Sequence, residues 1–337
     1  MSTDAAALRN DRLDADRCLR LHLEMARIRA FEETAIEALQ EKLVLGALHP
    51  YIGQEAIAVG VCANLERRDL LLSTHRGHGH TLAKGADPEA MMRELFGRAG
   101  GTCGGKGGSM HIADFGIGML GANGVVAANI TIAAGAAHAI KLKGDDRVVA
   151  CFFGDGAINR GPFLEGLNWA AVFRLPVLFV CEDNGYAATT ETARMTAGPG
   201  AAARAGSLGI PAAEVDGNDV AAVDEAARSL VAAIRNGGGP RMLVAKTYRL
   251  TGHTAVDAGA YRSAEEVARR WKDDPLLRCE VLLEGCGVPA STLAGQGSAA
   301  REEMRRASER ARAAPWPDPE TAFDDVQDVG DPRRSAY

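Results

Sequence analysis

Apolar and polar positions near the middle of the chain follow one another in the order strand, helix, strand. The runs 147–153 and 177–181 are short and almost wholly apolar, which is typical of strands buried on both faces. Between them, apolar residues from 163 to 174 recur at helical spacing. A right-handed crossover of about 30 residues makes two such strands parallel neighbours. The pattern therefore predicts a βαβ unit within a parallel sheet.

The same periodicities extend to both sides of this unit. Further helices are predicted over residues 14–40, 55–65, 88–96, 127–142, 219–236, 263–270 and 301–312, and further strands over residues 70–72, 210–215 and 241–248. Residues 97–108 contain seven glycines and predict an irregular loop, either a plain connection or one that faces a ligand. The whole pattern predicts an α/β fold, a parallel sheet with helices on both faces, followed by a C-terminal helical extension.

Oxygen-bearing groups follow both strands of the βαβ unit, at the point where each strand ends. Asp155 lies in a Gly-Asp-Gly turn after the first strand, and Asn184 and Tyr186 follow the second. Parallel neighbours bring these ends to one edge, where open α/β sheets bind ligands. Such donors suit Mg²⁺ or Ca²⁺, and Mg²⁺ usually completes its shell with phosphate oxygens. A metal with a diphosphate ligand is predicted here, against the alternative that a lone Gly-Asp-Gly is a simple turn.

Composition and charge exclude several classes of partner. The 337 residues carry a formal net charge of −6, which argues against nucleic acid as the main partner. No run of 18 apolar residues predicts a membrane span, and residues 1–10 lack the apolar core of a signal peptide. The seven cysteines form no Cys-x-x-Cys pair and are expected to be reduced thiols. A soluble, cytoplasmic protein is expected.

Several motifs together resemble one known family. The Gly-Asp-Gly turn followed by Asn184 resembles the thiamine diphosphate motif. Residues 73–80 (STHRGHGH), 104–111 (GGKGGSMH) and 121–124 (GANG) match, in order, the alpha subunits of the 2-oxo acid and acetoin dehydrogenase complexes. The resemblance covers about residues 15–325. It implies the thiamine diphosphate-binding fold, with thiamine diphosphate and Mg²⁺ as cofactors.

The resemblance also implies roles for individual residues. The metal would be held by Asp155, Asn184 and the backbone carbonyl of Tyr186, and His78 and His253 would serve as catalytic groups. The implied cofactor contacts are His75, Arg76, Gly124, Val126, Gly154, Asp155, Gly156, Ala157, Asn184, Tyr186, Arg249 and His253. Among these, Arg76, Arg249, Gly156 and Ala157 would contact the diphosphate, the carbonyl of Gly124 would accept from the aminopyrimidine, and Val126 would support the bent cofactor.

Two histidine segments have alternative interpretations. The spacing of residues 75–80 does not fit a zinc pair on a helix, and no Cys or carboxylate cluster completes a zinc site nearby in the sequence. His253 follows a predicted strand, where a surface histidine with no function is the alternative. Pyruvate-type relatives mostly carry an aromatic residue in place of His75, so this residue resembles the acetoin type.

The chain departs from the family pattern at a few positions. Asp183 stands where the family has the first Asn of a pair, and Ala187 stands in place of a common Gly. Residues 257–259 are Asp-Ala-Gly where the family usually has Asp-Pro-Gly, which leaves the stiffness of this loop open. Residues 124–127 are Gly-Val-Val-Ala where relatives have Gly-Ile-Val-Gly, with a packing segment at a helix start as the alternative. None of these changes removes an implied metal ligand.

The implied function is that of an alpha subunit that cleaves the carbon–carbon bond of acetoin or of a 2-oxo acid such as pyruvate. The acyl group would pass to a lipoyl-bearing acyltransferase, and a beta subunit would complete the active site in an α₂β₂ assembly. The alternatives are the N-terminal half of a split transketolase and a non-catalytic cofactor-binding assembly subunit. The predicted division is an N-terminal helical segment (1–45), a diphosphate-binding domain (46–262) and a C-terminal helical extension with a tail (263–337).

Overall fold

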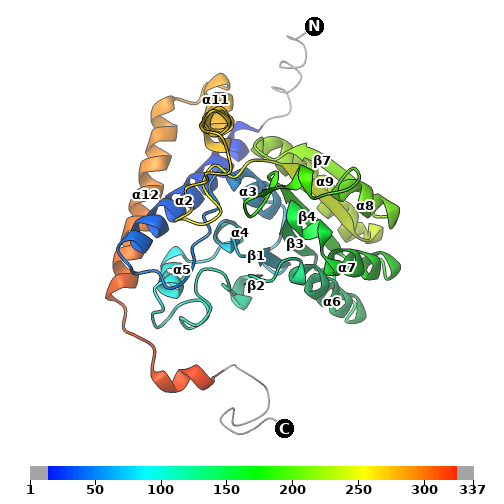
Figure 1. The fold of residues 1–337 in the computed structure, drawn as a ribbon, viewed down its shortest axis with the longest axis horizontal. Coiled ribbons are helices and arrows are strands. Elements are labelled where there is room, and N and C mark those ends of the chain that lie inside the picture. Colours follow the sequence, from blue (N-terminus) through cyan, green and yellow to red (C-terminus); the bar gives the residue numbers. More distant parts are fainter. Residues whose placement is uncertain (1–13, 325–337) are drawn as a thin grey trace.

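Six short strands form one parallel sheet in the computed structural model, which describes residues 14–324 (Figure 1). The spatial order is β2-β1-β3-β4-β8-β7, and every neighbouring pair is parallel. The strands are β1 (Leu70–Thr74), β2 (Met119–Asn123), β3 (Val149–Gly154), β4 (Val177–Asp183), β7 (Ala212–Asp216) and β8 (Arg241–Lys246). A separate antiparallel pair joins β5 (Tyr186–Ala187) and β6 (Thr190–Glu191). The predicted α/β class is confirmed.

Helices cover both faces of the sheet. The first half of the described chain contributes α2 (Ala15–Gln40), α3 (Glu55–Cys62), α4 (Gly77–Ala83), α5 (Pro88–Leu95), α6 (Ala128–Leu142) and α7 (Gly161–Val172). The second half contributes α8 (Ala201–Ser207), α9 (Val220–Ala233), α10 (Ala264–Arg270), α11 (Pro275–Gly285) and α12 (Ala290–Ala313). Short 3₁₀ turns connect several of them.

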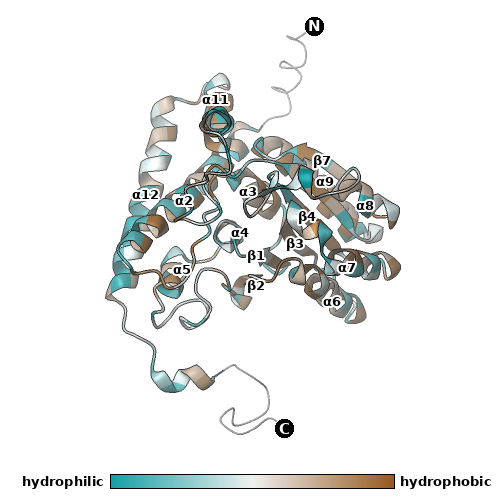
Figure 2. Ribbon diagram, viewed as in Figure 1, coloured by the Kyte–Doolittle hydropathy of each residue, from teal (hydrophilic) through white to brown (hydrophobic). Residues whose placement is uncertain are grey.

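Alternate side chains of each central strand enter different cores. In β3, Val149, Cys151 and Phe153 pack with α6 and α7, whereas Ala150 and Phe152 pack with α2, α3 and α9. All five side chains are at most 2% exposed, so both faces of the strand are covered. Figure 2 shows the central strands mainly in the hydrophobic colour, while the long helices α2 and α12 carry hydrophilic stretches. Burial on two faces explains why the strands are continuous apolar runs.

The predicted βαβ unit is confirmed, and the sequence analysis missed other elements. β3 and β4 are parallel neighbours, with Gly154 opposite Glu182. β2, α4 and α8 were not predicted, and α12 begins at Ala290 rather than at residue 301. Glycines in α4 lower its helix propensity, but packing requires them: a Cβ at Gly79 would lie 2.2 Å from the ring of Tyr51. Tertiary contacts therefore override local preference in this helix.

One buried carboxylate organises the glycine-rich loop. Glu94, at the end of α5, is fully buried and accepts four backbone N–H groups, from Cys103 (2.7 Å), Gly105 (2.9 Å), Gly107 (2.7 Å) and Gly108 (3.1 Å). A Cβ at Gly107 would lie 2.5 Å from the carbonyl oxygen of His111, so the glycine allows a close approach. The loop is therefore irregular in secondary structure yet held at its centre.

The long helices α2 and α12 lie side by side at one edge of the molecule, with α11 next to α2 (Figure 1). No helix within residues 14–324 is both long and apolar enough to span a membrane. The predictions for residues 1–10 and for the tail beyond residue 324 lie outside the described residues.

Candidate functional site

A cavity of about 360 Å³ opens at the carboxyl ends of β1, β3 and β4. Its wall contains every residue predicted to contact the cofactor: His75, Arg76, Gly124, Val126, Gly154, Asp155, Gly156, Ala157, Asn184, Tyr186, Arg249 and His253. These residues are up to 178 positions apart in the chain, from His75 to His253. The parallel sheet explains this convergence, because all its strands end at the same edge.

The predicted metal ligands lie around one corner of this cavity. Asp155 is 4% exposed, and its carboxylate accepts from Thr192 Oγ1 (2.5 Å) and from the backbone of Gly156 (3.1 Å). Burial, and then the charge of the nearby Asp183, raise the pKa of Asp155 to about 6. The side chain of Asn184 donates to Gln54 (2.9 Å). A divalent cation would offset the buried negative charge, so this oxygen donor set fits Mg²⁺.

Two buried arginines face the same cavity without a carboxylate partner. Arg76 and Arg249 are 4% and 2% exposed. Within residues 14–324, their guanidinium groups bind carbonyl oxygens, the ring of His253 and the hydroxyl of Tyr261. Burial and the charge of Arg249 lower the pKa of Arg76 to about 9, and burial also lowers the pKa of Arg249. Two cations that destabilise each other in this way form a receptor for a dianionic group. A diphosphate fits this arrangement.

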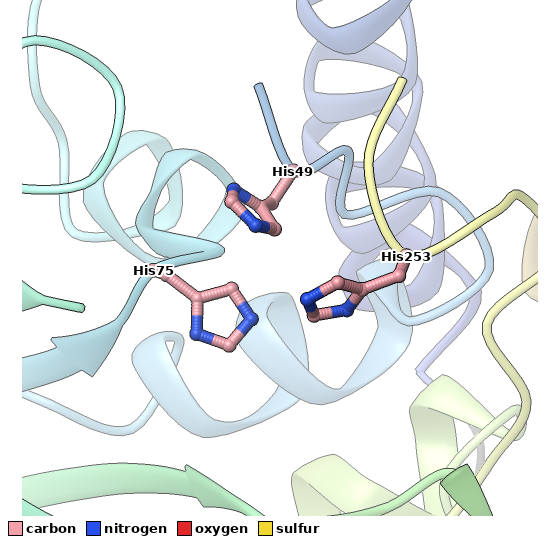
Figure 3. A group of neighbouring side chains, drawn as sticks. All are labelled: His49, His75 and His253. Atoms are coloured by element: carbon pink, nitrogen blue, oxygen red, sulfur yellow. The ribbon is translucent and has the colours of Figure 1, made fainter. Parts of the chain in front are cut away.

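Three histidines from separate segments point toward one another in the cavity (Figure 3). His49 precedes α3 by a few residues, His75 follows β1, and His253 lies in the loop after β8. Burial, followed by the charge of Arg76, lowers the pKa of His49 to about 3, of His75 to about 2 and of His253 to about 4. At neutral pH all three rings are uncharged.

The loop that carries His253 is held by its own hydrogen bonds. Asp257 accepts from the backbone of His253 (2.6 Å), from that of Gly259 (2.9 Å) and from the hydroxyl of Tyr261 (3.0 Å). Tyr261 in turn accepts from Arg249 (2.6 Å). The loop thus has a fixed shape although Ala258 replaces the proline that is usual in the family.

His78 is not brought into the cavity wall. Its ring is fully buried behind the wall, where Nδ1 lies 3.0 Å from the Glu32 carboxylate and Nε2 lies 3.0 Å from Ser109 Oγ. Both ring nitrogens are therefore engaged, and the ring links α2 to the segment after the glycine-rich loop. A direct role of His78 at the reacting centre stays a prediction.

The sequence analysis missed several polar groups of the site. His49 lines the cavity, and its Nδ1 is buried without a hydrogen-bond partner in the described residues. Glu182 also lines it, and its carboxylate accepts from Tyr51 and contacts His80 Nε2 (2.9 Å). Neither residue lies in a recognisable motif, because the side chains that each one contacts are 26 to 204 positions away in the chain. The one available signal was that Glu182 directly follows the predicted strand 177–181 and precedes Asn184 by two positions.

A second and larger depression, of about 1020 Å³, adjoins the cavity and shares Asp155, Asn184 and Tyr186 with it. It lacks both buried arginines and the three histidines, and its wall is rich in carboxylates. The smaller cavity is therefore the candidate site, despite its size.

Comparison with known proteins agrees with this geometry. Residues 23–320 match the dehydrogenase E1 component family. The alpha subunit of acetoin:2,6-dichlorophenolindophenol oxidoreductase from Bacillus subtilis is 48% identical over 75% of this chain and 76% of its own length. The subunit of the same name from Cupriavidus necator is 44% identical over 96% of this chain and 97% of its own length. The pyruvate dehydrogenase E1 component subunit alpha of Zymomonas mobilis is 41% identical over 93% of this chain and 89% of its own length. The chain therefore belongs to the dehydrogenase E1 component family.

Proposed function

We propose that the chain is the alpha subunit of a thiamine diphosphate-dependent dehydrogenase that cleaves acetoin. The observation that carries the proposal is a pair of buried arginines that line the same cavity as the Asp155 and Asn184 side chains, an arrangement that suits a metal-bound diphosphate. Acetoin is favoured over pyruvate because the two acetoin relatives are more similar to the chain than the Zymomonas subunit. The uncharged histidines beside the cavity also suit a neutral substrate better than a carboxylate.

Thiamine diphosphate, when bound, supplies a nucleophilic carbon and an electron-accepting ring for cleaving a carbon–carbon bond next to a carbonyl. We assign the diphosphate to Arg76, Arg249 and the backbone N–H groups of Gly156 and Ala157. The carbonyl of Gly124 would accept from the aminopyrimidine, and the half-exposed Val126 would support the bent cofactor. Gly156 also lets Ala187 pack closely beside it, because a Cβ at position 156 would lie 2.7 Å from that of Ala187.

We propose Mg²⁺ as the metal, held by Asp155, Asn184 and the backbone carbonyl of Tyr186. All three are hard oxygen donors, and the diphosphate oxygens would complete the shell. The ion would also remove the repulsion between Asp155 and Asp183 that raises the pKa of Asp155.

His253 is proposed to hold a proton at Nε2, facing the substrate. Its Nδ1 accepts from Arg76 (3.0 Å), so the neutral ring carries its proton on Nε2 and can donate a hydrogen bond from this N–H to a substrate oxygen. His75 is proposed to contact the bound cofactor and substrate from the opposite side. For His78, the contacts to Glu32 and Ser109 favour a positioning role over a direct one.

We further propose a beta subunit as partner, in an α₂β₂ assembly, and a lipoyl-bearing acyltransferase as acceptor of the acetyl unit. The relatives' names designate alpha subunits, which supports a partner. The family resemblance assigns the glutamate that activates the aminopyrimidine to a separate domain, which the partner would supply. We also propose a cytoplasmic location for this assembly.

Cofactor binding tests the site by itself. Titration of the full chain, together with its beta subunit, with thiamine diphosphate and Mg²⁺ in a calorimeter measures the dissociation constant. Arg76→Met and Arg249→Met should each weaken binding about 10- to 100-fold, since each removes charge-assisted bonds worth about 1.5–3 kcal/mol. Arg228→Met, on α9 and outside the cavity, is the matched control and should bind as the unchanged chain does. Unchanged affinity in both cavity variants would reject the site.

Substrate choice is tested by dye reduction. The chain co-expressed with its beta subunit is assayed with acetoin, pyruvate and branched 2-oxo acids at equal concentrations, and acetoin should react fastest. The chain alone should show little turnover, and full activity without a partner would contradict the proposed assembly. Reaction with a ketose phosphate alone would favour the split-transketolase alternative, which the family match over residues 23–320 disfavours. A non-catalytic subunit is disfavoured because the arginines, metal donors and histidines are all present.

A further inference from the structure

The three cavity histidines form a cluster of ligands with only nitrogen donors. Figure 3 shows the rings of His49, His75 and His253 pointing at a common centre, each from a different segment of the chain. The ring centres lie 4.6, 4.9 and 5.5 Å apart, and the facing nitrogens all lie within 4.8 Å of one another. The cluster is distinct from the Asp155 corner, whose donors are oxygens.

This spacing matches the geometry of a three-histidine metal centre. Zinc–nitrogen bonds of about 2.0–2.1 Å in a tetrahedral arrangement place three imidazole centres roughly 5 Å from each other. The observed ring centres already have this separation, so rotation of the rings is enough to bring the nitrogens into the coordination shell. The fourth position would face the cavity and remain open to water.

Two of the three rings have free nitrogens. Nδ1 of His49 is buried and unpartnered in the described residues, and the side chain is only 7% exposed. His75 makes ring contacts with both neighbours but no hydrogen bond within the described part of the chain. A buried nitrogen without a partner is costly, and coordination would satisfy it. Because burial and Arg76 lower the pKa of these rings, protons do not compete for them near neutral pH.

Arg76 opposes binding of a cation. Its Nη2 donates to Nδ1 of His253 (3.0 Å), and coordination of that ring breaks this bond. Arg76 keeps its contacts to the carbonyls of Pro50 (2.8 Å) and His253 (2.8 Å), so the loss is partial. The nearby positive charge makes the site weaker than a structural zinc site, and binding is therefore reversible.

We propose that a divalent first-row transition ion, foremost Zn²⁺, binds His49, His75 and His253 and reversibly blocks the cavity. Imidazole ligands favour zinc over magnesium, which requires oxygen donors. The ion occupies the space beside Arg76 and ties up the nitrogen donors that face the substrate. This inhibitory site goes beyond the proposed function, because it needs neither thiamine diphosphate nor a substrate.

Metal binding to the full chain without cofactor tests the proposal directly. Co²⁺ should bind with the intense visible absorption of tetrahedral cobalt, and Zn²⁺ should displace it at one ion per chain. In competition with a chromophoric chelator, His49→Phe and His75→Phe should each bind Zn²⁺ at least about tenfold more weakly, since each removes one of three ligands. His138→Phe, on α6 and outside the cavity, is the control and should bind zinc as the unchanged chain does.

Two further results separate this site from the magnesium site. Asp155→Asn should leave zinc affinity unchanged, and excess Mg²⁺ should not displace the zinc. Zinc binding that survives both phenylalanine substitutions, or that is lost with Asp155→Asn, would overturn the proposal, as would an octahedral cobalt spectrum. In crystals soaked with zinc, the anomalous signal should lie between the three rings.

Discussion

At the scale of single residues, the site is built from groups whose pKa values or backbone conformations differ from those they would have in water. Buried arginines, uncharged histidines and a protonation-prone aspartate all face one cavity. Some backbone conformations are equally unusual, since Ala127 and Ala188 have positive φ values of 71° and 53°. Relatives with Gly-Ile-Val-Gly have glycine at the first of these positions, which fits the left-handed conformation.

Relief of backbone strain at Ala188 should stabilise the chain. The residue is exposed, so glycine loses no buried methyl group, and its φ of 53° costs a non-glycine residue about 1 kcal/mol. We expect Ala188→Gly to raise the free energy of unfolding by about 0.5–1 kcal/mol. Ala187→Gly, one position earlier and not left-handed, should lower it. Urea unfolding of both variants measures the difference, and equal effects would contradict the strain at Ala188.

The buried histidine His49 should make the fold sensitive to acid. Its pKa is about 3 in the folded chain and near 6.5 when unfolded, so between these values the unfolded chain binds a proton that the folded chain does not. Stability therefore falls as the pH drops below 6.5. His49→Phe lacks this loss. As the pH falls through this range, its free energy of unfolding should rise relative to that of the unchanged chain by about 1.4 kcal/mol per pH unit.

Urea unfolding at several pH values measures this dependence on His49. Above about pH 7.5 the difference between the variant and the unchanged chain should be constant, because the ring is then neutral in both states. A difference that does not change between pH 5 and pH 7 would show that the ring is not held neutral.

At the scale of elements, irregular segments keep their shape through single buried groups. The loop after β8 is held by Asp257, and the glycine-rich loop is held by Glu94. In both cases a carboxylate accepts several N–H or O–H groups, which replaces the regular hydrogen bonding of a helix or strand. The next residue after the glycine-rich loop, Ser109, contacts His78, so the shape of this loop reaches the back of the cavity wall.

Replacement of Glu94 by glutamine should loosen the glycine-rich loop. Glutamine keeps one acceptor oxygen, while its NH₂ group faces two backbone donors that then lose their acceptor. We expect Glu94→Gln to lower the free energy of unfolding by about 2–4 kcal/mol. Hydrogen exchange at Cys103, Gly105, Gly107 and Gly108 should accelerate.

Glu89→Gln on the same helix is the control for this prediction. Its two partners, Arg93 and Arg310, are 31% and 63% exposed, so the change should cost less than about 1 kcal/mol. Equal protection of the loop amides in both variants would show that Glu94 does not organise the loop.

At the scale of the whole molecule, ion pairs join the N-terminal helix to distant elements. Arg29 on α2 contacts Glu55 at the start of α3 (2.7 Å) and Asp274 at the start of α11 (2.9 Å). Arg27 contacts Glu303 on α12 (2.8 Å). The contacts of Arg29 are buried, whereas Glu303, the partner of Arg27, is 41% exposed. The two arginines are therefore expected to contribute differently to the stability of the fold.

Removal of these two arginines should have unequal effects. Arg29→Leu leaves two buried carboxylates without a cation and should lower the free energy of unfolding by about 3–5 kcal/mol. Arg27→Leu removes the ion pairs of Arg27 with Glu24 and Glu303, which are 38% and 41% exposed, and should lower the free energy of unfolding by less than about 1 kcal/mol. Chemical denaturation of the two variants in parallel measures both values. Similar losses would show that burial does not decide the strength of these pairs.

The sequence by itself determined the α/β class, the βαβ unit and the predicted contact residues that line the cavity. Apolar runs and helical spacing report burial directly, and parallel strands end at one edge, so Asp155 and Asn184 had to meet. The family motifs then supplied Arg76 and Arg249.

The tertiary structure decided what local patterns do not encode. α4 forms despite its glycines, because close packing against Tyr51 requires them. His78 lies behind the cavity wall, since Glu32 binds it from another helix. His49 joins His75 and His253 only after the sheet and its loops have brought three separate segments together. The low pKa of these rings likewise depends on burial beside Arg76, a property of the folded chain alone.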